Sequence, residues 1–357
     1  MTFKKELLSK FSPLLLRWNS QHNTRKMPWK GEKDPYKIWL SEIILQQTRV
    51  EQGLKYYEKF ISAYPDVARL ATAKDEKIYK LWEGLGYYTR CKNLIETARF
   101  ISKELNGNFP DQFEQILSLK GIGNYTASAI ASFAYNLPHA VVDGNVFRVL
   151  SRVFGISQPI DTTKGKKLFS QLAEELLDKK KPGIYNQALM DFGAIICKPQ
   201  NPLCNNCVLR DHCFAFKNDL VSELPIKAKK TTIRIRWFNY LLIEFEGKIY
   251  IHKRTANDIW RNLHEFALIE TRKSMSVTEV LTKAEKGGIL KRKFYKVVSV
   301  SPPYSQQLSH QKIQGRVIKI VLKKELVIPG FTPVLKKRVS NYAFPKFINA
   351  YFEGGNS

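Results

Sequence analysis

The pattern of apolar and polar positions divides the chain into two parts with different periods. From residue 1 to about residue 220, apolar residues recur with helical spacing, and short breaks rich in Gly, Pro, Asn and Asp separate the helical runs. A basic, proline-containing segment follows at residues 223–232, and the pattern changes after it. We therefore expect an all-helical domain over residues 1–222, a linker over 223–232 and a second domain over 233–357.

The second part has the pattern of a sheet. β-branched and aromatic residues alternate through residues 234–254 around Glu246-Gly247, which is the signal of a β-hairpin. Residues 296–305 and 315–330 continue this pattern. The fold class predicted from the whole chain is mainly α, with a smaller α/β domain after the helical one.

Composition and charge narrow the class of partner. With 357 residues and 44% hydrophobic residues the chain can bury sizeable cores, and its formal net charge is +26. Such an excess favours polyanionic partners, nucleic acid first and an anionic membrane surface second. No apolar stretch approaches the roughly 18 residues of a membrane span, and the N-terminus resembles an amphipathic helix more than a signal peptide. We expect a cytoplasmic protein.

Four of the five cysteines lie close together. Cys197, Cys204, Cys207 and Cys213 are separated by six, two and five residues, whereas Cys91 stands alone and is expected to be a buried small residue. Clustered thiols in an intracellular chain favour a metal centre over disulfides. Four thiolates suit either tetrahedral zinc or a [4Fe–4S] cluster, and the spacing alone does not decide between the two.

A glycine-punctuated turn and a later aspartate form the first candidate site. Gly121 and Gly123 lie between two helical runs, where successive backbone N–H groups can bind a phosphate. Asp143 follows in an apolar setting, just before another helix start. A lone G-x-G is often only a turn, and Asp143 also suits a helix N-cap. The N-cap role is compatible with catalysis, because the positive end of a helix favours an ionised carboxylate.

A second candidate lies in the helical run at residues 38–45. Glu42 lies off the centre of its apolar face, and by itself it could be one more solvated helix glutamate. Thr48 and Glu51 match a capping box, which predicts that a new helix starts at Thr48. Gln46 and Gln47 would then lie at the break between two helices, where side chains can project.

A third candidate is the turn at Gly84–Gly86, which is followed by Tyr87 and Tyr88. Glycines allow a tight turn, and an exposed aromatic beside it could insert between bases. Ordinary helix capping with a core tyrosine is the alternative interpretation.

Together these motifs resemble a known family. The residues that carry the resemblance lie at 39–48 (WLSEIILQQT), 82–88 (WEGLGYY), 119–127, 142–146 (VDGNV) and 186–193 (NQALMDFG). The chain resembles the helix-hairpin-helix DNA glycosylases of the endonuclease III superfamily, and within it the MutY-type adenine DNA glycosylases. The resemblance covers nearly the whole chain. It implies a [4Fe–4S] cluster in the loop of residues 197–213.

The resemblance also assigns roles to the acidic residues. Bifunctional members carry a Schiff-base lysine where this chain has Tyr125, so the resemblance implies a glycosylase without lyase activity. Glu42 would be the general acid at N7 of adenine, and Asp143 would stabilise the oxocarbenium-like C1′. Tyr125 and Asn145 would assist them.

Other positions would contact DNA once the adenine has left the base stack. The resemblance implies that Gln47 and Tyr87 insert into the duplex. It also implies that Arg25, Trp29, Leu45 and Gln187 lie near the base pocket, and that Gly121 and Gly123 bind a phosphate. The set implied in the helical part is Arg25, Trp29, Leu45, Gln47, Thr48, Gly86, Tyr87, Gly121, Gly123 and Gln187.

The second domain resembles the Nudix-like domain of the same family, through its strand pattern and residues 342–345 (YAFP). The sequence motif for nucleotide hydrolysis is absent from it. Leu308, Ser309 and His310 match the loop that contacts 8-oxoguanine in the family, where phenylalanine usually stands in place of Leu308. As an isolated triplet it could be an ordinary loop. The leucine removes a stacking contact, whereas Ser309 can still form a hydrogen bond.

Three functions follow, in descending order. The first is a monofunctional enzyme that removes adenine mispaired with 8-oxoguanine or guanine in double-stranded DNA. We expect it to act as a monomer in a bacterial-type cytoplasm, associated with the nucleoid. The second is a bifunctional pyrimidine glycosylase/lyase, and the third is a catalytically silent iron–sulfur DNA-binding protein.

Overall fold

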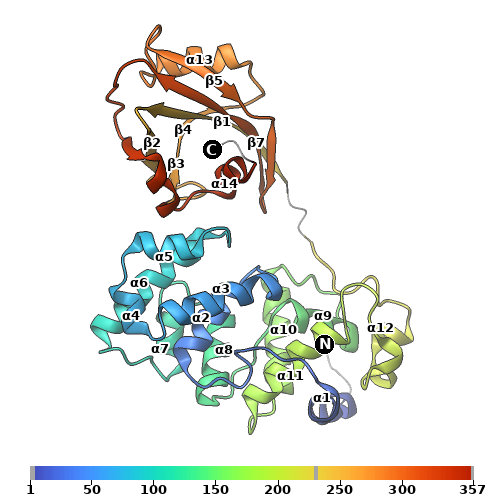
Figure 1. The fold of residues 1–357 in the computed structure, drawn as a ribbon. Helices are drawn as coiled ribbons and strands as arrows, with labels where there is room; N and C mark the ends of the chain where they lie inside the picture. The colour runs from blue at the N-terminus through green and yellow to red at the C-terminus, as the bar shows by residue number, and fades with distance from the viewer. Residues whose placement is uncertain (1–4, 229–231, 355–357) are drawn as a thin grey trace. The chain divides into compact units, whose positions relative to one another are not determined.

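The computed structural model describes residues 5–228 and 232–354 (Figure 1). The chain forms two compact units. The first consists of residues 1–72 and 93–230, and the second of residues 73–92 and 231–357. Within the described ranges, no helix has the length and apolar character that crossing a membrane requires.

The first unit is helical. Its elements are α1 (Lys5–His22), α2 (Pro35–Leu45), α3 (Val50–Ala63), α4 (Val67–Thr72), α6 (Tyr88–Glu104) from Asn93 onward, α7 (Phe113–Ser118), α8 (Asn124–Tyr135), α9 (Gly144–Phe154), α10 (Thr163–Leu176), α11 (Pro182–Ile195), the short 3₁₀ turns η1 (Cys204–Asn206) and η2 (Arg210–His212), and α12 (Phe214–Lys217).

Local sequence sets the ends of the helices that carry the site. The side chain of Asp34 accepts a hydrogen bond from the backbone N–H of Tyr36, and Pro35 occupies the first position of α2. Asp143 caps α9, which ends at Gly155 in the left-handed conformation. These caps fix where α2 and α9 begin, and therefore where their polar side chains project.

Helix packing builds the core of the first unit. α2 packs against α3 and α8, and α9 packs against α11. A continuous apolar cluster joins α1, α9, α10 and α11 to the cysteine loop, with Phe169, Tyr185 and Phe192 fully buried. Burial of this kind is the main source of stability for helices of modest length.

The second unit contains an eight-stranded sheet. Its elements are α5 (Asp75–Trp82), β1 (Arg234–Phe245), β2 (Lys248–Lys253), β3 (His264–Glu265), β4 (Ala267–Thr271), α13 (Val277–Lys286), β5 (Tyr295–Val300), β6 (Tyr304–Gln307), β7 (Gln311–Leu322), β8 (Thr332–Leu335), η3 (Lys336–Asn341) and α14 (Lys346–Glu353).

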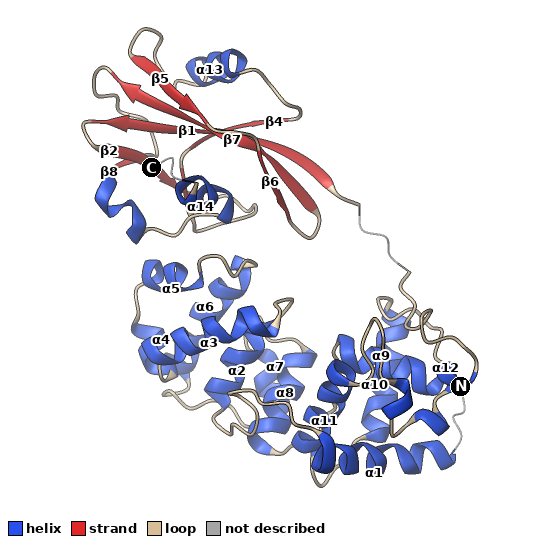
Figure 2. Cartoon of the chain, turned by 45° about the vertical axis from the view of Figure 1, so that its right-hand side comes forward, coloured by secondary structure: helices blue, strands red, loops and turns tan. Residues whose placement is uncertain are grey.

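Strands β1 and β7 form the centre of this sheet. The main order is β3-β2-β1-β7-β5, and β4, β6 and β8 pair with β1, β7 and β2 respectively. β1 and β7 run parallel, whereas β1–β2 and β6–β7 are antiparallel. α13 and α14 lie on opposite faces of the sheet (Figure 2). A mixed sheet covered by helices fits the Nudix-like architecture expected for this part of the chain.

The fold agrees with most sequence predictions. Helices dominate as far as about residue 220, and β1 and β2 form a hairpin at Glu246-Gly247. Cys91 is fully buried. The predicted capping box is wrong: α3 starts at Val50, and its N-cap Arg49 makes no side-chain capping bond. The hydroxyl of Thr48 instead donates to the carbonyl of Gln46, which closes the turn between the two helices. Residues 229–231 of the predicted linker lie outside the described ranges.

Candidate active site

Glu42 is a buried carboxylate on the third turn of α2. Only 5% of its surface is exposed. Burial raises the pKa of Glu42 to about 7, a hydrogen bond with Tyr125 opposes the shift, and the negative charge of Asp143 adds to it. Within the described residues no lysine or arginine forms an ion pair with Glu42. This carboxyl group can therefore carry a proton near neutral pH.

Tyr125 follows the first residue of α8 and faces Glu42. Burial, and then the charges of Glu42 and Asp143, raise the pKa of Tyr125 well above its ordinary value. Its hydroxyl is therefore a neutral hydrogen-bond donor to Glu42. One turn of α2 further on, the side-chain amide of Gln46 donates to the hydroxyl of Thr126 at 3.2 Å. These contacts fix α2 against the start of α8.

Two hydrogen bonds at the start of α9 hold the side chain of Asp143. One oxygen accepts from the backbone N–H of Val146 at 2.7 Å, and the other accepts from the side-chain amide of Asn145 at 2.7 Å. Burial raises the pKa of Asp143, while these hydrogen bonds and the charge of Arg148 lower it. The net shift is upward, opposite to the direction expected from the helix terminus alone, because the cost of burying the charge outweighs the N-cap.

Arg148 links Asn145 to the cysteine loop. Its guanidinium donates to Asn145 Oδ1 at 2.8 Å, to the carbonyl of Gly193 at 2.7 Å and to the carbonyl of Cys197 at 2.7 Å. Because Arg148 holds Asn145 Oδ1, Asn145 presents its side-chain NH₂ group to Asp143. The orientation of Asp143 thus depends on a chain of hydrogen bonds that ends at the first cysteine.

The predicted hairpin forms between α7 and α8. Gly121 has φ +79°, and a Cβ there would lie 2.7 Å from the side chain of Asn93. Ile122 is buried, and Gly123 is the N-cap of α8, with open space where a Cβ would lie. The turn is therefore anchored by an apolar side chain and leaves its glycine backbone open to a ligand.

The predicted base-pocket residues Arg25 and Gln187 converge on Asp191. This carboxylate is fully buried on α11 and accepts from Arg25 at 2.9 Å and from Gln187 at 3.0 Å. Lys30 and Asn23 bind its second oxygen, at 3.0 Å and 2.9 Å. Asp191 therefore positions both residues.

The other predicted contacts of the first unit lie around α2 and α3. The ring of Trp29 makes an edge contact with Tyr57, with the centroids 5.4 Å apart. Leu45 is half-buried and packs closely against Gly53. Gln47 is exposed and has φ +54°, a left-handed conformation that is uncommon for a residue other than glycine.

In the second unit, Tyr87 contacts the predicted lesion loop. The turn between α5 and α6 places Gly86 at φ +81° and Tyr87 at φ +49°. The Tyr87 ring is 44% exposed, and its hydroxyl lies 2.5 Å from Ser309 Oγ. The guanidinium of Arg90 lies 5.2 Å from the Tyr87 ring centroid and bonds the carbonyl of Gly86. Two residues predicted to contact DNA, Tyr87 and Ser309, therefore touch each other in the free protein.

The lesion loop itself is the tip of a β-hairpin. Leu308, Ser309 and His310 connect β6 to β7, and the backbone N–H of Leu308 donates to the carbonyl of Gln311 at 2.7 Å. Ser309 and His310 are exposed, and Leu308 is half-buried. A short, hydrogen-bonded tip presents these side chains in a defined order.

The four clustered cysteines line a single cavity in the first unit. Cys197, Cys204, Cys207 and Cys213 surround it together with Arg152, which lies 3.5 Å from Cys197 Sγ. Burial raises the pKa of Cys207 to about 12. Among the described residues no His, Cys, Asp and Glu side chains converge as ligands of one metal ion.

Comparison with known proteins is consistent with this arrangement. Residues 40–179 match the family model of the HhH-GPD superfamily base excision DNA repair proteins. An adenine DNA glycosylase of Buchnera aphidicola subsp. Schizaphis graminum is 37% identical over 73% of this chain and 76% of its own. A second, from Buchnera aphidicola subsp. Baizongia pistaciae, is 33% identical over 88% of this chain and 87% of its own.

The chain belongs to the adenine DNA glycosylase family of helix-hairpin-helix proteins. The Homo sapiens member is 41% identical over 57% of this chain and 39% of its own. Among solved structures, a thermostable thymine-DNA glycosylase superposes with a TM-score of 0.55, at 31% identity over 60% of this chain and 98% of that one. A trapped endonuclease III–DNA intermediate has the same fold, with a TM-score of 0.53 and 18% identity over 61% of this chain and 100% of that one.

Three residues that support the site were not predicted from the sequence. Asp191, Arg148 and Arg90 each hold predicted site residues in place. Asp191 follows Gln187 by one helical turn, and Arg148 follows Asn145 by three residues on α9, so helical spacing could have found both. Arg90 follows the Tyr87 turn by three residues, a relation that needs the turn geometry to be known.

Proposed function

We propose that this protein removes adenine mispaired with 8-oxoguanine or guanine in double-stranded DNA, and that it releases the base without cutting the strand. The observation that carries the proposal is that buried Glu42 and half-buried Asp143 lie close enough to influence each other's charge, with no cation bonded to Glu42 in the described part of the chain. The adenine DNA glycosylases among the relatives give the target base.

Glu42 supplies the proton. Adenine is a poor leaving group until a ring nitrogen is protonated, and an acid with a pKa near the working pH transfers a proton most effectively. The pKa of Glu42, about 7, meets that condition. The proton goes from the Glu42 carboxyl to N7 of the flipped adenine, and the Tyr125 hydroxyl stabilises the carboxylate that remains.

Asp143 stabilises the sugar. As the N-glycosidic bond breaks, C1′ becomes positively charged, and an ionised carboxylate beside it lowers the barrier until water adds to C1′ and loses a proton. Val146 N–H, Asn145 and Arg148 all favour the anion of Asp143 over its protonated form. The two carboxyl groups thus differ in environment, and therefore in role.

The hairpin tip at Leu308, Ser309 and His310 supports recognition of the opposite base. Ser309 offers a hydroxyl to the lesion once its contact with Tyr87 is broken. Leu308 packs but cannot stack as an aromatic ring does. We therefore propose a weaker preference for 8-oxoguanine over guanine than a phenylalanine at position 308 would give.

The cysteine loop supports a resident [4Fe–4S] cluster. Cys197, Cys204, Cys207 and Cys213 would hold it, and in this fold it would supply a structural crosslink of the loop. Arg152 donates to Cys197 Sγ and to the carbonyls of Lys198 and Pro199, so it shapes the first half of the loop. The fit rests on the four thiols that line one cavity.

Single-turnover base release tests the function. Duplexes containing A:8-oxoguanine, A:G and T:G are mixed with excess protein, and the free base and the strand break are measured separately. We expect adenine from the first two duplexes, no thymine from the third, and strand cleavage only after alkali. Release of thymine but not adenine would overturn the assignment, and release of no base would favour a silent DNA-binding protein.

Borohydride trapping tests the remaining alternative. Position 125 holds a tyrosine, which cannot form the Schiff base of a lyase. No covalent protein–DNA adduct should therefore accumulate. An adduct that accumulates at the rate of base release would instead support the bifunctional enzyme.

A further inference from the structure

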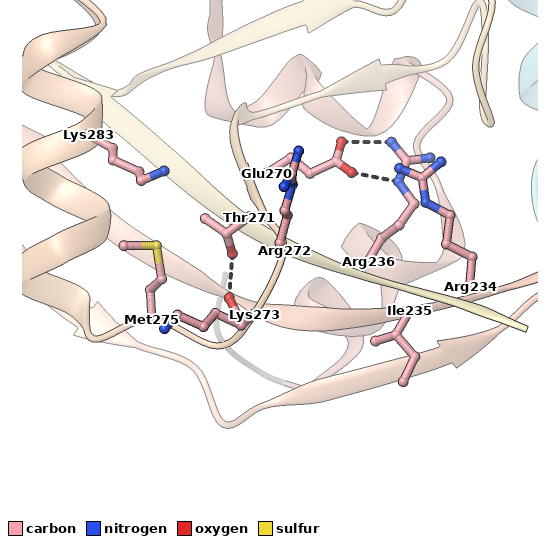
Figure 3. Close-up of a pocket in the computed structure, with 9 residues that line it drawn as sticks. All are labelled: Arg234, Ile235, Arg236, Glu270, Thr271, Arg272, Lys273, Met275 and Lys283. Atoms are coloured by element: carbon pink, nitrogen blue, oxygen red, sulfur yellow. Dashed lines mark hydrogen bonds and ion pairs between the residues drawn. The ribbon is translucent and has the colours of Figure 1, made fainter.

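A basic pocket lies in the second unit, away from the residues considered so far. It has a volume of about 800 Å³ and lies between the start of β1, the end of β4 and α13 (Figure 3). Its lining includes Arg234, Arg272, Lys273 and Lys283, with Ile235 and Met275 between them. All four cationic side chains belong to exposed residues.

The pocket has an excess of positive charge. Its fifth cation, Arg236, is buried and binds Glu270 and Asp258, each through two oxygens at 2.7–2.8 Å. The carboxylates near Arg236 are therefore already committed. Glu279 lies close enough to Lys273 and Lys283 to feel their charge, but its side chain is bound in the capping box of α13. Among the residues described, none of the four exposed cations forms an ion pair.

The pocket adjoins the hairpin tip directly. The backbone N–H of Arg234 donates to the carbonyl of His310 at 3.0 Å, and Arg234 pairs with Gln311 across β1 and β7. Arg236 also donates to the side chain of Gln311 at 3.1 Å. A strand whose base contacts Ser309 would therefore carry its neighbouring phosphates past the mouth of this pocket.

We propose that the pocket binds a backbone phosphate of the DNA strand that carries 8-oxoguanine; this rests on the proposed contact of the hairpin tip with that base. The exposed, flexible cations favour a backbone over a free nucleotide. A nucleotide pocket would also need buried donors and acceptors for the base, whereas Arg236 and Glu270 already bind each other. Cations of this kind fix register and affinity without contacting a base edge.

The test compares two double variants of the full-length protein. Arg272→Gln/Lys273→Gln removes two charges from the pocket. Lys291→Gln/Lys323→Gln removes two exposed charges outside the pocket lining, of which Lys323 follows the other end of β7. The dissociation constant for an A:8-oxoguanine duplex is measured against salt concentration. The pocket variant should bind up to about tenfold more weakly with a salt slope smaller by about 1 per lost phosphate contact, and the control should keep the wild-type slope.

A neutral methylphosphonate, scanned along the lesion strand, locates the phosphate. One position should weaken binding by the wild-type protein and leave the pocket variant unaffected. Equal slopes for all proteins, or equal losses in pocket and control variants, would overturn the proposal. Loss of dGTP binding in the pocket variant with an unchanged DNA slope would do the same, because the pocket would then be a nucleotide site.

Base release by the same proteins separates the two proposals. The pocket variant should keep the wild-type single-turnover rate constant at saturating protein. Normal adenine release with an unchanged salt slope contradicts only the phosphate site. If the wild-type protein releases no adenine, the proposed function fails, and the methylphosphonate scan still shows whether the pocket binds a phosphate.

Discussion

Buried carboxylates in the helical unit and in the sheet unit have opposite surroundings. Glu42 is 5% exposed, and its polar neighbours are the hydroxyl of Tyr125 and the carboxylate of Asp143. Glu265 in β3 is 6% exposed, yet it bonds Arg254 at 2.5 Å and the hydroxyl of Tyr240 at 3.1 Å. Burial raises the pKa of both carboxyl groups, but only at Glu265 does an arginine oppose the shift, so the two sites differ in the charge of their neighbours.

The sheet unit neutralises its buried acids with arginines. Burial alone would raise the pKa of Asp258, but hydrogen bonds and charge from Arg236, with the backbone of Ile259, bring it below the ordinary value. Arg236 and Arg254 share that carboxylate. A cluster of this kind links β1 and β3 through arginine–carboxylate pairs, although burial still holds the pKa of Glu265 above its ordinary value.

The helical unit contains both kinds of acid. Asp191 is fully buried and bonds Arg25 and Lys30, so it is compensated as in the sheet unit. Glu42 bears the cost of burial without a cation. An uncompensated acid in a folded protein destabilises it, and this pattern is typical of groups retained for chemistry. The comparison therefore identifies Glu42, and less strongly Asp143, as acids retained for catalysis.

The largest expected effect comes from Asp143→Asn. The amide can still accept from the N–H of Val146, so the N-cap and the fold should survive, while the negative charge beside C1′ is lost. Single-turnover adenine release should fall by roughly 10³-fold or more with DNA binding retained. Release within tenfold of wild type would remove Asp143 from the reaction. Asp191→Asn is the matched control, because it also removes a buried carboxylate of this unit but should lower stability and base binding.

Arg254→Met tests the compensated side of the comparison. Removal of the guanidinium leaves the Glu265 carboxylate buried without its partner, which costs about 3–5 kcal/mol. Urea unfolding followed by hydrogen exchange in β1–β3 should show this loss. The double variant Arg254→Met/Glu265→Gln should recover much of it, because no charge then remains unpaired. If the single variant unfolds like wild type, charge compensation does not hold this cluster together.

The sequence predicts most of the fold, because the relevant signals are local. Helical and alternating periods separate the two parts, and the glycine turn before α8 and the hairpin after β1 are encoded within a few residues. The start of α3 was mispredicted because Thr48 can satisfy either a cap or a turn, and only packing decides between them.

The candidate site was predictable in its residues but not in its energetics. Motifs indicate Glu42, Tyr125 and Asp143, yet no sequence pattern shows that Glu42 of α2 lies near Tyr125 of α8 and Asp143 before α9. The upward shift of the Asp143 pKa depends on that packing, as do the contacts of Asp191 with Arg25 and of Tyr87 with Ser309. These relations join residues from about 80 to more than 200 positions apart, beyond the range of local patterns.

Glu42→Gln tests the buried acid that has no cationic partner. The substitution should raise the stability of the protein and lower its activity. The folded-state pKa of about 7 lies above the ordinary glutamate value of 4.5, so the folded protein binds this proton more tightly than the unfolded chain does. The resulting stabilisation is complete below about pH 4.5 and is lost as the pH rises through about 7. Glutamine imitates the protonated form at every pH. The variant should therefore match wild type at pH 4.5 and exceed it by on the order of 3 kcal/mol at pH 8.

The activity of the wild-type protein should depend on the same proton. Wild-type adenine release should decline above about pH 7 as Glu42 loses its proton, and Glu42→Gln should be slower by roughly 10²-fold with no such decline. Thermal unfolding and single-turnover release from pH 5 to pH 9 measure both properties on one preparation. If the variant is less stable than wild type at pH 8, Glu42 has a stabilising partner and belongs with Glu265. If it is more stable but equally active, the buried acid is real and the proton that releases adenine comes from another group.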